Sequence, residues 1–291
     1  MRRRGFLEHV AWTGAGIAFA LGADGVIAPV HAEAAAPLFV QISDSHVGFS
    51  QAANPDVTAT LERAVARINA LPAQPAFVVH TGDVTHLATA EQFAQAREIL
   101  GALRAPLVTI PGEHDVIGDG RARFAQAFGR ADAPDGWFSW DQGGVHCVAL
   151  VNVFGGETMG RLGEAQLAWL EKDLASRPPS TPLVVFGHVP LFALYPAWGW
   201  TTDDGARAIA LLRRFSSVTV LNGHVHQIVS HVEGSLRFYT AAATAYPQPA
   251  PGTAARPGPL AVPPDHLLHV LGYRTVELDA AGTQVDDHDL A

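Results

Sequence analysis

Short apolar runs alternate with amphipathic segments over the first half of the chain. The runs near 38–43, 76–81 and 106–110 have the length and composition of buried strands. Between them, residues 55–70 and 90–103 carry apolar positions at helical spacing. This alternation predicts strand–helix–strand units and therefore an α/β fold.

The second half of the chain is richer in strands. Residues 137–140 and 145–151 flank the Gly143-Gly144 turn and predict a hairpin. The later pattern predicts two more helices, near 163–175 and 204–215. It also predicts strands that end at Leu221 or span 225–232, 236–241 and 272–279. A strand-rich half after alternating strands and helices indicates mixed sheets.

Five of the apolar runs are followed by histidine or carboxylate side chains, usually beside a glycine. The five motifs are Asp44-Ser45-His46, Gly82-Asp83, Gly112-Glu113-His114-Asp115, Gly187-His188 and Gly223-His224-Val225-His226. Buried strands that end in this way deliver their side chains to one edge of a sheet. Imidazole and carboxylate ligands together suit Zn, Mn or Fe better than calcium. One such histidine is usually a core residue, but five repeated strand ends predict a metal site.

These motifs resemble those of the calcineurin-like metallophosphoesterase superfamily, in particular its cyclic-nucleotide-phosphodiesterase-like and purple-acid-phosphatase-like branches. The family pattern DxH, GD, GNH, GHxP and GHxH appears here, in the same order, as DSH, GDV, GEHD, GHVP and GHVH. The sequence departs at one position, where Glu113 replaces asparagine. The resemblance implies a four-layer α/β/β/α sandwich with two mixed β-sheets.

The resemblance also implies a binuclear centre of Fe, Mn or Zn ions, in which a bridging hydroxide attacks phosphorus. The first metal would be held by Asp44, His46 and His226, with Asp83 bridging to a second metal held by His188, His224 and position 113. His114 matches a family histidine that does not bind metal but contacts phosphate and protonates the leaving oxygen. Asp115 is expected to orient the imidazole of His114 and raise its pKa.

Three positions near these motifs need separate interpretations. Glu113 is longer than asparagine and negatively charged. We expect it to bind the second metal; if it turned away, that metal would be weakly bound or absent. His86 stands where purple acid phosphatases carry an iron-binding tyrosine, so it is either a ligand of the first metal or a loop histidine. His80 is expected to pack in the core.

Two segments could shape a substrate pocket. Tyr195, Trp198 and Trp200 either stack on a planar leaving group or plug the loop onto the body of the protein. The proline-rich stretch 246–264 cannot form a helix or central strand, so it predicts a long loop. That loop is either a surface excursion or a rim over the site. Asn152 either faces the site or simply ends a strand.

Composition narrows the class of partner. The formal net charge is −9 and no basic run follows the first four residues, so we expect no nucleic-acid partner. The single cysteine, Cys147, excludes an intramolecular disulfide and a cysteine-rich zinc site. A chain of 291 residues is long enough for one large domain with a full core.

The N-terminus has the features of an export signal. Residues 3–7, Arg-Arg-Gly-Phe-Leu, fit the twin-arginine motif, and small residues before positions 33 and 37 offer cleavage sites. The apolar stretch is short and interrupted by Asp24, which argues against a stable membrane span. We therefore expect residues 1–36 to engage the twin-arginine translocation machinery and to be cleaved. A single domain, 37–291, would remain in the periplasm or be secreted. The alternative is a basic tail on a cytoplasmic protein.

The leading hypothesis is an exported binuclear metallophosphoesterase that hydrolyses small phosphomonoesters or phosphodiesters. One alternative is an iron enzyme similar to purple acid phosphatases, suggested by His86 and the anionic Glu113. Another is a non-catalytic metal-binding protein, in which Glu113 has compromised hydrolysis.

Overall fold

A computed structural model describes residues 13–14, 17–21, 27–30, 38–155, 157–279 and 282–291. The chain divides into two compact units, Met1–Ala36 and Pro37–Ala291. In the first unit, β1 (Thr13–Gly14), β2 (Ile17–Leu21) and β3 (Ile27–Val30) form a small antiparallel sheet. The twin-arginine motif and the residues next to the expected cleavage sites lie outside the described residues.

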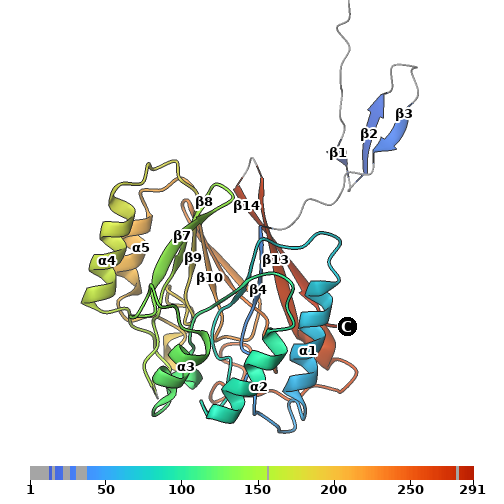
Figure 1. Cartoon of the computed structure of the whole chain (residues 1–291), viewed down its shortest axis with the longest axis vertical. Coiled ribbons are helices and arrows are strands. Elements are labelled where there is room, and N and C mark those ends of the chain that lie inside the picture. The colour runs from blue at the N-terminus through green and yellow to red at the C-terminus, as the bar shows by residue number, and fades with distance from the viewer. Residues whose placement is uncertain (1–12, 15–16, 22–26, 31–37, 156, 280–281) are drawn as a thin grey trace, which may run out of the picture. The chain divides into compact units, whose positions relative to one another are not determined.

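The second unit contains two mixed sheets (Figure 1). In the five-stranded sheet, three strands pair in parallel: β4 (Phe39–Ile42), β5 (Val78–His80) and β6 (Leu107–Thr109). Strand β13 (Gly272–Asp279) pairs antiparallel with β4, and β14 (Gly282–Asp289) pairs antiparallel with β13 at the edge.

The six-stranded sheet has the order β11-β12-β10-β9-β8-β7. Its four central strands are parallel: β8 (Val145–Ala149), β9 (Leu183–Phe186), β10 (Val218–Asn222) and β12 (Leu236–Thr240). The edge strands β7 (Phe138–Gln142) and β11 (Val229–Glu233) are antiparallel to their neighbours. The expected hairpin across Gly143-Gly144 is therefore confirmed.

Helices cover the outer face of each sheet, as Figure 1 shows. On the five-stranded side these are α1 (Val57–Asn69), α2 (Ala90–Leu100) and α3 (Gly120–Phe128). On the six-stranded side they are α4 (Glu164–Ala175) and α5 (Gly205–Leu212). The short elements η1 (Glu113–Val116), η2 (Pro196–Trp198) and α6 (Leu267–Val270) lie in connections.

The alternation of side chains along β4 explains the layers. Val40 and Ile42 pack with Leu61 of α1, whereas Phe39 packs with Phe186 of the other sheet. Successive side chains of a strand point to opposite faces, so one apolar run supplies both the helix–sheet core and the core between the sheets. The α/β/β/α sandwich is thus confirmed, and Cys147 is a buried free thiol between the sheets.

The strand expected over 225–232 begins only at Val229. The residues before it cannot be extended, because His224 and His226 have φ values of 67° and 55°. Helix α3 and strand β14 were not predicted, since neither segment carries a strong apolar period. No helix of the described part of the chain is long and apolar enough to cross a membrane.

Candidate metal centre and active site

The predicted residues come together where the carboxyl ends of five parallel strands meet. Asp44, Asp83 and Glu113 follow β4, β5 and β6, and His188 and His224 follow β9 and β10. Each parallel strand leaves its carboxyl end at the same edge of its sheet, so the topology alone gathers these side chains.

The backbone at this edge is unusual. Among the described residues, six non-glycine positions have positive φ, and five of them carry site side chains: Asp44, His46, Asp83, His224 and His226. Such residues persist only where surrounding bonds hold them, and they cluster at functional sites. Here the N–H of Asp44 donates to the carbonyl of Gly82, and the N–H of His46 donates to that of Asp83.

Two glycines let the strand ends approach each other. A Cβ on Gly112 would lie 2.1 Å from Oδ1 of Asp83, and one on Gly223 would lie 2.7 Å from Oδ2 of Asp44. No side chain fits at these distances. Glycine at both positions is therefore a requirement of the site.

Asp44, His46 and His226 form a first cluster within reach of one ion. Nε2 of His226 lies 3.3 Å from Oδ1 of Asp44 and 3.2 Å from Nε2 of His46. Burial alone would raise the pKa of Asp44, but the charges of His226 and His188 and hydrogen bonding lower it to about 2. This carboxylate is ready to bind a cation.

Glu113, His188 and His224 form a second cluster. The two carboxylate oxygens of Glu113 lie 2.8 Å from Nε2 of His188 and 2.8 Å from Nδ1 of His224. Oδ2 of Asp83 lies 3.5 Å from Nε2 of both His46 and His188. Asp83 therefore stands between the two clusters.

Four nitrogen and oxygen atoms of the second cluster are buried, and the close contacts among them do not have the geometry of hydrogen bonds. They are Oε2 of Glu113, Nε2 of His188, and both ring nitrogens of His224. Buried polar atoms are rarely left unpaired, because desolvation is then uncompensated. A metal ion would satisfy these atoms, and imidazole with carboxylate is a donor set for Zn, Mn or Fe. The residues present therefore fit two metal ions.

Backbone carbonyls fix the orientation of two of the imidazoles. Nδ1 of His188 donates to the carbonyl of Thr81 at 2.7 Å, and Nδ1 of His226 donates to that of Tyr246 at 2.6 Å. In the neutral ring these bonds place the proton on Nδ1, so that Nε2 is the atom available to a metal, the usual arrangement around such an ion.

Comparison with known proteins agrees with this geometry. Residues 37–228 match the sequence profile of the calcineurin-like phosphoesterases. The chain belongs to this family. It is 30% identical to a glycerophosphodiester phosphodiesterase, GpdQ, of Enterobacter lignolyticus over 249 residues, which cover 80% of this chain and 86% of that protein. It is 29% identical to a probable cyclic nucleotide phosphodiesterase of Rhodopseudomonas palustris, over 63% of this chain and 69% of that protein.

Solved structures share the fold of this phosphoesterase. A dimetal phosphatase from Danio rerio superposes with a TM-score of 0.66 at 14% identity, over 88% of this chain and 97% of that one. A purple acid phosphatase from yellow lupin superposes with a TM-score of 0.61, also at 14% identity, over 94% of this chain and 57% of that one. At this identity the likeness concerns the fold alone.

The structure corrects the expected contact between Asp115 and the imidazole of His114. The Asp115 carboxylate instead accepts hydrogen bonds from the N–H groups of Val84, Thr85 and Gly112 and from the hydroxyl of Thr85. Nδ1 of His114 donates to the carbonyl of His86 at 2.7 Å. Asp115 thus holds the loops together, and a backbone carbonyl orients the histidine.

The surroundings of Asp115 and His114 raise the pKa values of both side chains above their usual values. Burial and the neighbouring Asp83 raise the pKa of Asp115 to about 6, against the hydrogen bonds from the backbone. Burial would lower the pKa of His114, but Asp83 and Glu113 outweigh it and raise the pKa. His114 lines the pocket, so it is placed to donate a proton there.

His86 lies beside the first cluster on the outer side of His46. Its Nδ1 is 3.4 Å from Nδ1 of His46, whereas Nε2 of His46 faces Asp83. Its ring stacks on that of His114, with centroids 5.0 Å apart. Burial lowers the pKa of His86 to about 4, and the charge of His114 adds to the effect. His46, His86 and His114 lie within reach of one ion, but His86 approaches the nitrogen of His46 that does not face Asp83, so we expect it to be a loop histidine.

The pocket above the clusters encloses about 290 Å³ and has aromatic walls. Its apolar lining includes Phe49, Trp198, Trp200 and Tyr246. Both tryptophans also pack with Val225, so they plug the loop onto the body and at the same time form a pocket wall. None of the described residues that line the pocket is lysine or arginine.

The proline-rich loop forms a rim of this pocket, as one of its two interpretations predicted. Gln248 and residues 257–259 line the opening. The Gln248 amide donates to the carbonyl of His224 at 3.0 Å and accepts from the N–H of Gly258 at 2.9 Å. One side chain therefore ties the loop to a residue of the second cluster.

Asn152 and His80 support the site from outside it. Oδ1 of Asn152 accepts from the N–H groups of His188 and Val189, each at 3.2 Å. His80 is fully buried, and its Nε2 lies 2.9 Å from the hydroxyl of Ser45. Sequence reasoning missed the roles of Tyr246 and Gln248, because nothing in a proline-rich loop indicates which residues face a distant motif.

Proposed function

We propose that this chain is a binuclear metal-dependent phosphodiesterase that prefers small phosphodiesters to phosphomonoesters. The first metal would be held by Asp44, His46 and His226, the second by Glu113, His188 and His224, and Asp83 would bridge them. When bound, such a metal pair neutralises the phosphate, activates water and stabilises the leaving oxygen. The position of Glu113 in the second cluster carries the proposal.

The protein supplies positioning and a proton. The carbonyls of Thr81 and Tyr246 hold the rings of His188 and His226 with Nε2 inward. The carbonyl of His86 holds Nδ1 of His114, so Nε2 of His114 is the atom that gives a proton to the leaving oxygen. The aromatic walls exclude water around the bound ester.

Charge supports the preference for diesters. Three carboxylates, from Asp44, Asp83 and Glu113, face the clusters, where the family pattern with asparagine has two. With two divalent cations, the third carboxylate reduces the net positive charge of the centre. No lysine or arginine among the described lining residues restores it. A phosphodiester carries one negative charge and a monoester close to two near pH 7, so the loss of positive charge weakens monoester binding more.

Turnover of bis(4-nitrophenyl) phosphate and 4-nitrophenyl phosphate, measured with Mn, Fe or Zn, tests the proposal. We expect kcat/KM for the diester to exceed that for the monoester by at least tenfold with the best metal. A monoester rate equal to or above the diester rate would contradict the preference. Full metal occupancy without hydrolysis of either ester would favour the non-catalytic metal-binding alternative.

The same carboxylate supports a second candidate, an iron enzyme similar to purple acid phosphatases. A trivalent ion at one position would restore the positive charge that Glu113 removes. Elemental analysis and electron paramagnetic resonance of the protein purified with its native metals separate the candidates. Iron with a ferric resonance favours the second candidate, and divalent ions without ferric iron favour the first proposal.

We also propose that the enzyme is exported. The sequence Arg3-Arg4-Gly5-Phe6-Leu7 and the small residues up to Ala36 support a cleaved twin-arginine signal. When the full-length chain is expressed, the processed protein, residues 37–291, should appear in the periplasm or the medium. The double substitution of Arg3 and Arg4 by lysine should retain the uncleaved precursor in the cytoplasm. Undiminished export of that variant would contradict the pathway.

A further inference from the structure

Exposed apolar side chains gather around the catalytic pocket. Eight large apolar side chains are exposed in the described part of the chain, and seven belong to segments at the pocket or beside it: Leu87, Ile117, Phe154, Met159, Ile228, Leu260 and Val270. Val232, on the edge strand β11, is the eighth. Scattered apolar side chains are normal on a surface, whereas a gathered set marks a binding surface.

The rim of the pocket carries part of this set. Three members directly follow residues that line the pocket, since Leu87 follows His86, Met159 follows Thr158 and Leu260 follows Pro259. Two others, Phe154 and Ile117, belong to neighbouring loops whose backbones approach each other. A Cβ on Gly155, next to Phe154, would lie 2.6 Å from the carbonyl of Val116 and 3.8 Å from Cα of Ile117. The apolar rim therefore runs over several loops.

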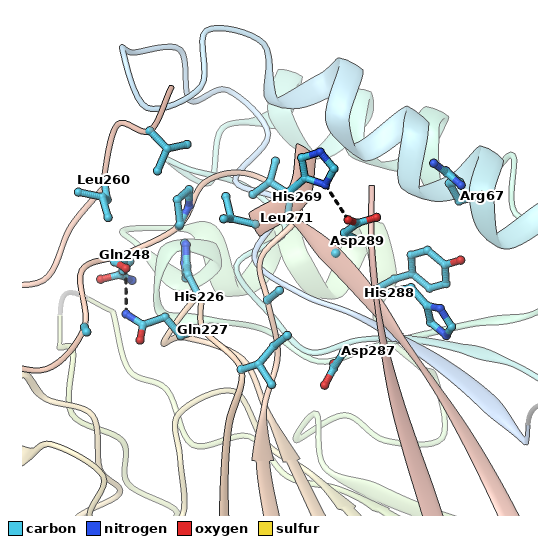
Figure 2. Close-up of a pocket in the computed structure, with 18 residues that line it drawn as sticks. Arg67, His226, Gln227, Gln248, Leu260, His269, Leu271, Asp287, His288 and Asp289 are labelled. Atoms are coloured by element: carbon cyan, nitrogen blue, oxygen red, sulfur yellow. Dashed lines mark hydrogen bonds and ion pairs between the residues drawn. The ribbon is translucent and has the colours of Figure 1, made fainter. Parts of the chain in front are cut away.

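A groove of about 880 Å³ adjoins the pocket and continues the apolar surface. It shares His226 and Gln248 with the pocket and is lined by Ile228, Leu260 and Val270. Figure 2 shows Leu260 near Gln248, and the ion pair of His269 with Asp289 on the opposite side of the groove. This volume lies within the range of pockets that bind small molecules.

The pocket offers aromatic contact rather than cationic groups, and the groove beside it is lined by both apolar and charged residues. Phe49, Trp198, Trp200 and Tyr246 line the pocket, and no lysine or arginine does so among its described residues. Arg67, on α1, is the one arginine or lysine among the described residues that line the groove. Figure 2 places Arg67 on the far side of the groove from Leu260 and Gln248.

We propose that the substrate is a phosphodiester with an apolar chain on one ester oxygen, and that this chain lies along the rim and groove at Leu260 and Val270. The proposal rests on the phosphodiesterase function above and names its substrate class. A concave groove beside the reacting centre suits a chain attached to the phosphate better than the flat face of a second copy. The net charge of −9 also argues against an anionic membrane surface as the occupant.

A series of methyl, butyl and octyl 4-nitrophenyl phosphates tests this inference. All three release the same nitrophenolate, so differences in rate report the contact with the chain. Below the aggregation limit of the octyl ester, we expect kcat/KM to rise at least tenfold from methyl to octyl, mainly through KM, because each buried methylene adds affinity.

Variants locate the contact. In the double variant Leu260→Ser/Val270→Ser, kcat/KM should rise less than twofold from the methyl to the octyl ester. Val232→Ser, which changes an exposed apolar residue away from the groove, should keep the full rise.

The outcomes separate the two proposals. Equal kcat/KM for methyl and octyl esters in the wild-type enzyme would overturn the inference and leave the phosphodiesterase function intact. Absence of hydrolysis of all three esters by the fully metallated protein would overturn the function itself. A wild-type dimer that the double variant dissociates, with no chain-length dependence, would show that a second copy covers the groove and would also overturn the inference.

Discussion

The Oε2 atom of Glu113 lies 2.8 Å from Nε2 of His188, at the position where the family pattern has a neutral asparagine. The other oxygen of this carboxylate lies equally close to Nδ1 of His224. Burial alone would raise the pKa of Glu113, but the charges of His224 and His188 lower it well below its usual value. The residue that departs from the family pattern is therefore an anion placed between the two imidazole rings of the second cluster.

Neutralising this carboxylate should change the choice of substrate. In Glu113→Gln, we expect the ratio of monoesterase to diesterase kcat/KM to rise about tenfold, equivalent to about 1.4 kcal/mol, because the site then attracts the second phosphate charge more strongly. The measurement is the pair of nitrophenyl esters at a fixed saturating metal concentration. Glu171→Gln, on the exposed face of α4, is the matched control and should leave the ratio unchanged. A ratio that stays constant in Glu113→Gln would argue against an electrostatic origin of the preference.

His114 should matter most for substrates with poor leaving groups. Protonation of the leaving oxygen assists an alkoxide strongly and a nitrophenolate weakly. In His114→Gln, we expect kcat for a dialkyl phosphate to fall about 100-fold and kcat for bis(4-nitrophenyl) phosphate to fall less than fivefold. Equal losses on both substrates would indicate a positioning role without proton donation.

His86 should be dispensable for metal binding. Its Nδ1 approaches the Nδ1 of His46, the ring nitrogen that does not face Asp83. We expect His86→Ala to retain the metal content of the wild type. We also expect it to lose activity severalfold, since the ring that stacks on His114 is gone. If elemental analysis showed one metal fewer per chain, His86 would be a ligand and the iron alternative would gain support.

A carboxylate that contacts a buried histidine, away from the site, makes stability depend on pH. His146 is fully buried, with Nδ1 2.8 Å from Asp141 and Nε2 2.7 Å from Asp173, which also accepts from the hydroxyl of Ser139. Burial would raise the pKa of Asp173, but the hydrogen bonds from His146 and Ser139 lower it below its usual value. A carboxyl with a lowered folded-state pKa stabilises the fold above its unfolded pKa, about 3.9, and loses this contribution as the pH falls through the folded value.

Replacing that carboxylate tests the sign of the effect. Because Asp173 is partly exposed, we expect Asp173→Asn to lower the free energy of unfolding by about 1 kcal/mol at pH 7. The difference in free energy of unfolding between the variant and the wild type should become smaller at pH 3.5, where the Asp173 carboxylate of the wild type begins to be protonated. Urea unfolding at the two pH values measures both differences. The same gap at both pH values would mean that the contribution is packing rather than charge.

The apolar patterning predicted an α/β fold with mixed sheets, because strands buried on both faces form continuous apolar runs. Val40 and Phe39 are an example, since these neighbours on β4 pack in two different cores, one between helix and sheet and one between the two sheets. The helix α3 escaped prediction because its buried side is confined to a few residues such as Phe124. The prediction of four layers came from the resemblance to the family. Local patterns could not provide it, since the order of strands depends on pairing between distant parts of the chain.

The sequence predicted the part of the site whose side chains directly follow the ends of strands. The motif spacing identified Asp44, Asp83 and His188, and the parallel topology then placed them together. The partner of Asp115 could not be predicted, because it depends on how the loop after β5 folds against η1. The contribution of Tyr246 was equally hidden, since it acts through a backbone carbonyl.

Elemental analysis of the exported protein tests the central claim, that Glu113 completes a second metal site. We expect about two metal ions per chain in the wild type, about one in Glu113→Ala, and two in the surface control Glu171→Ala. Two ions per chain in Glu113→Ala, or a single ion in the wild type, would contradict the account.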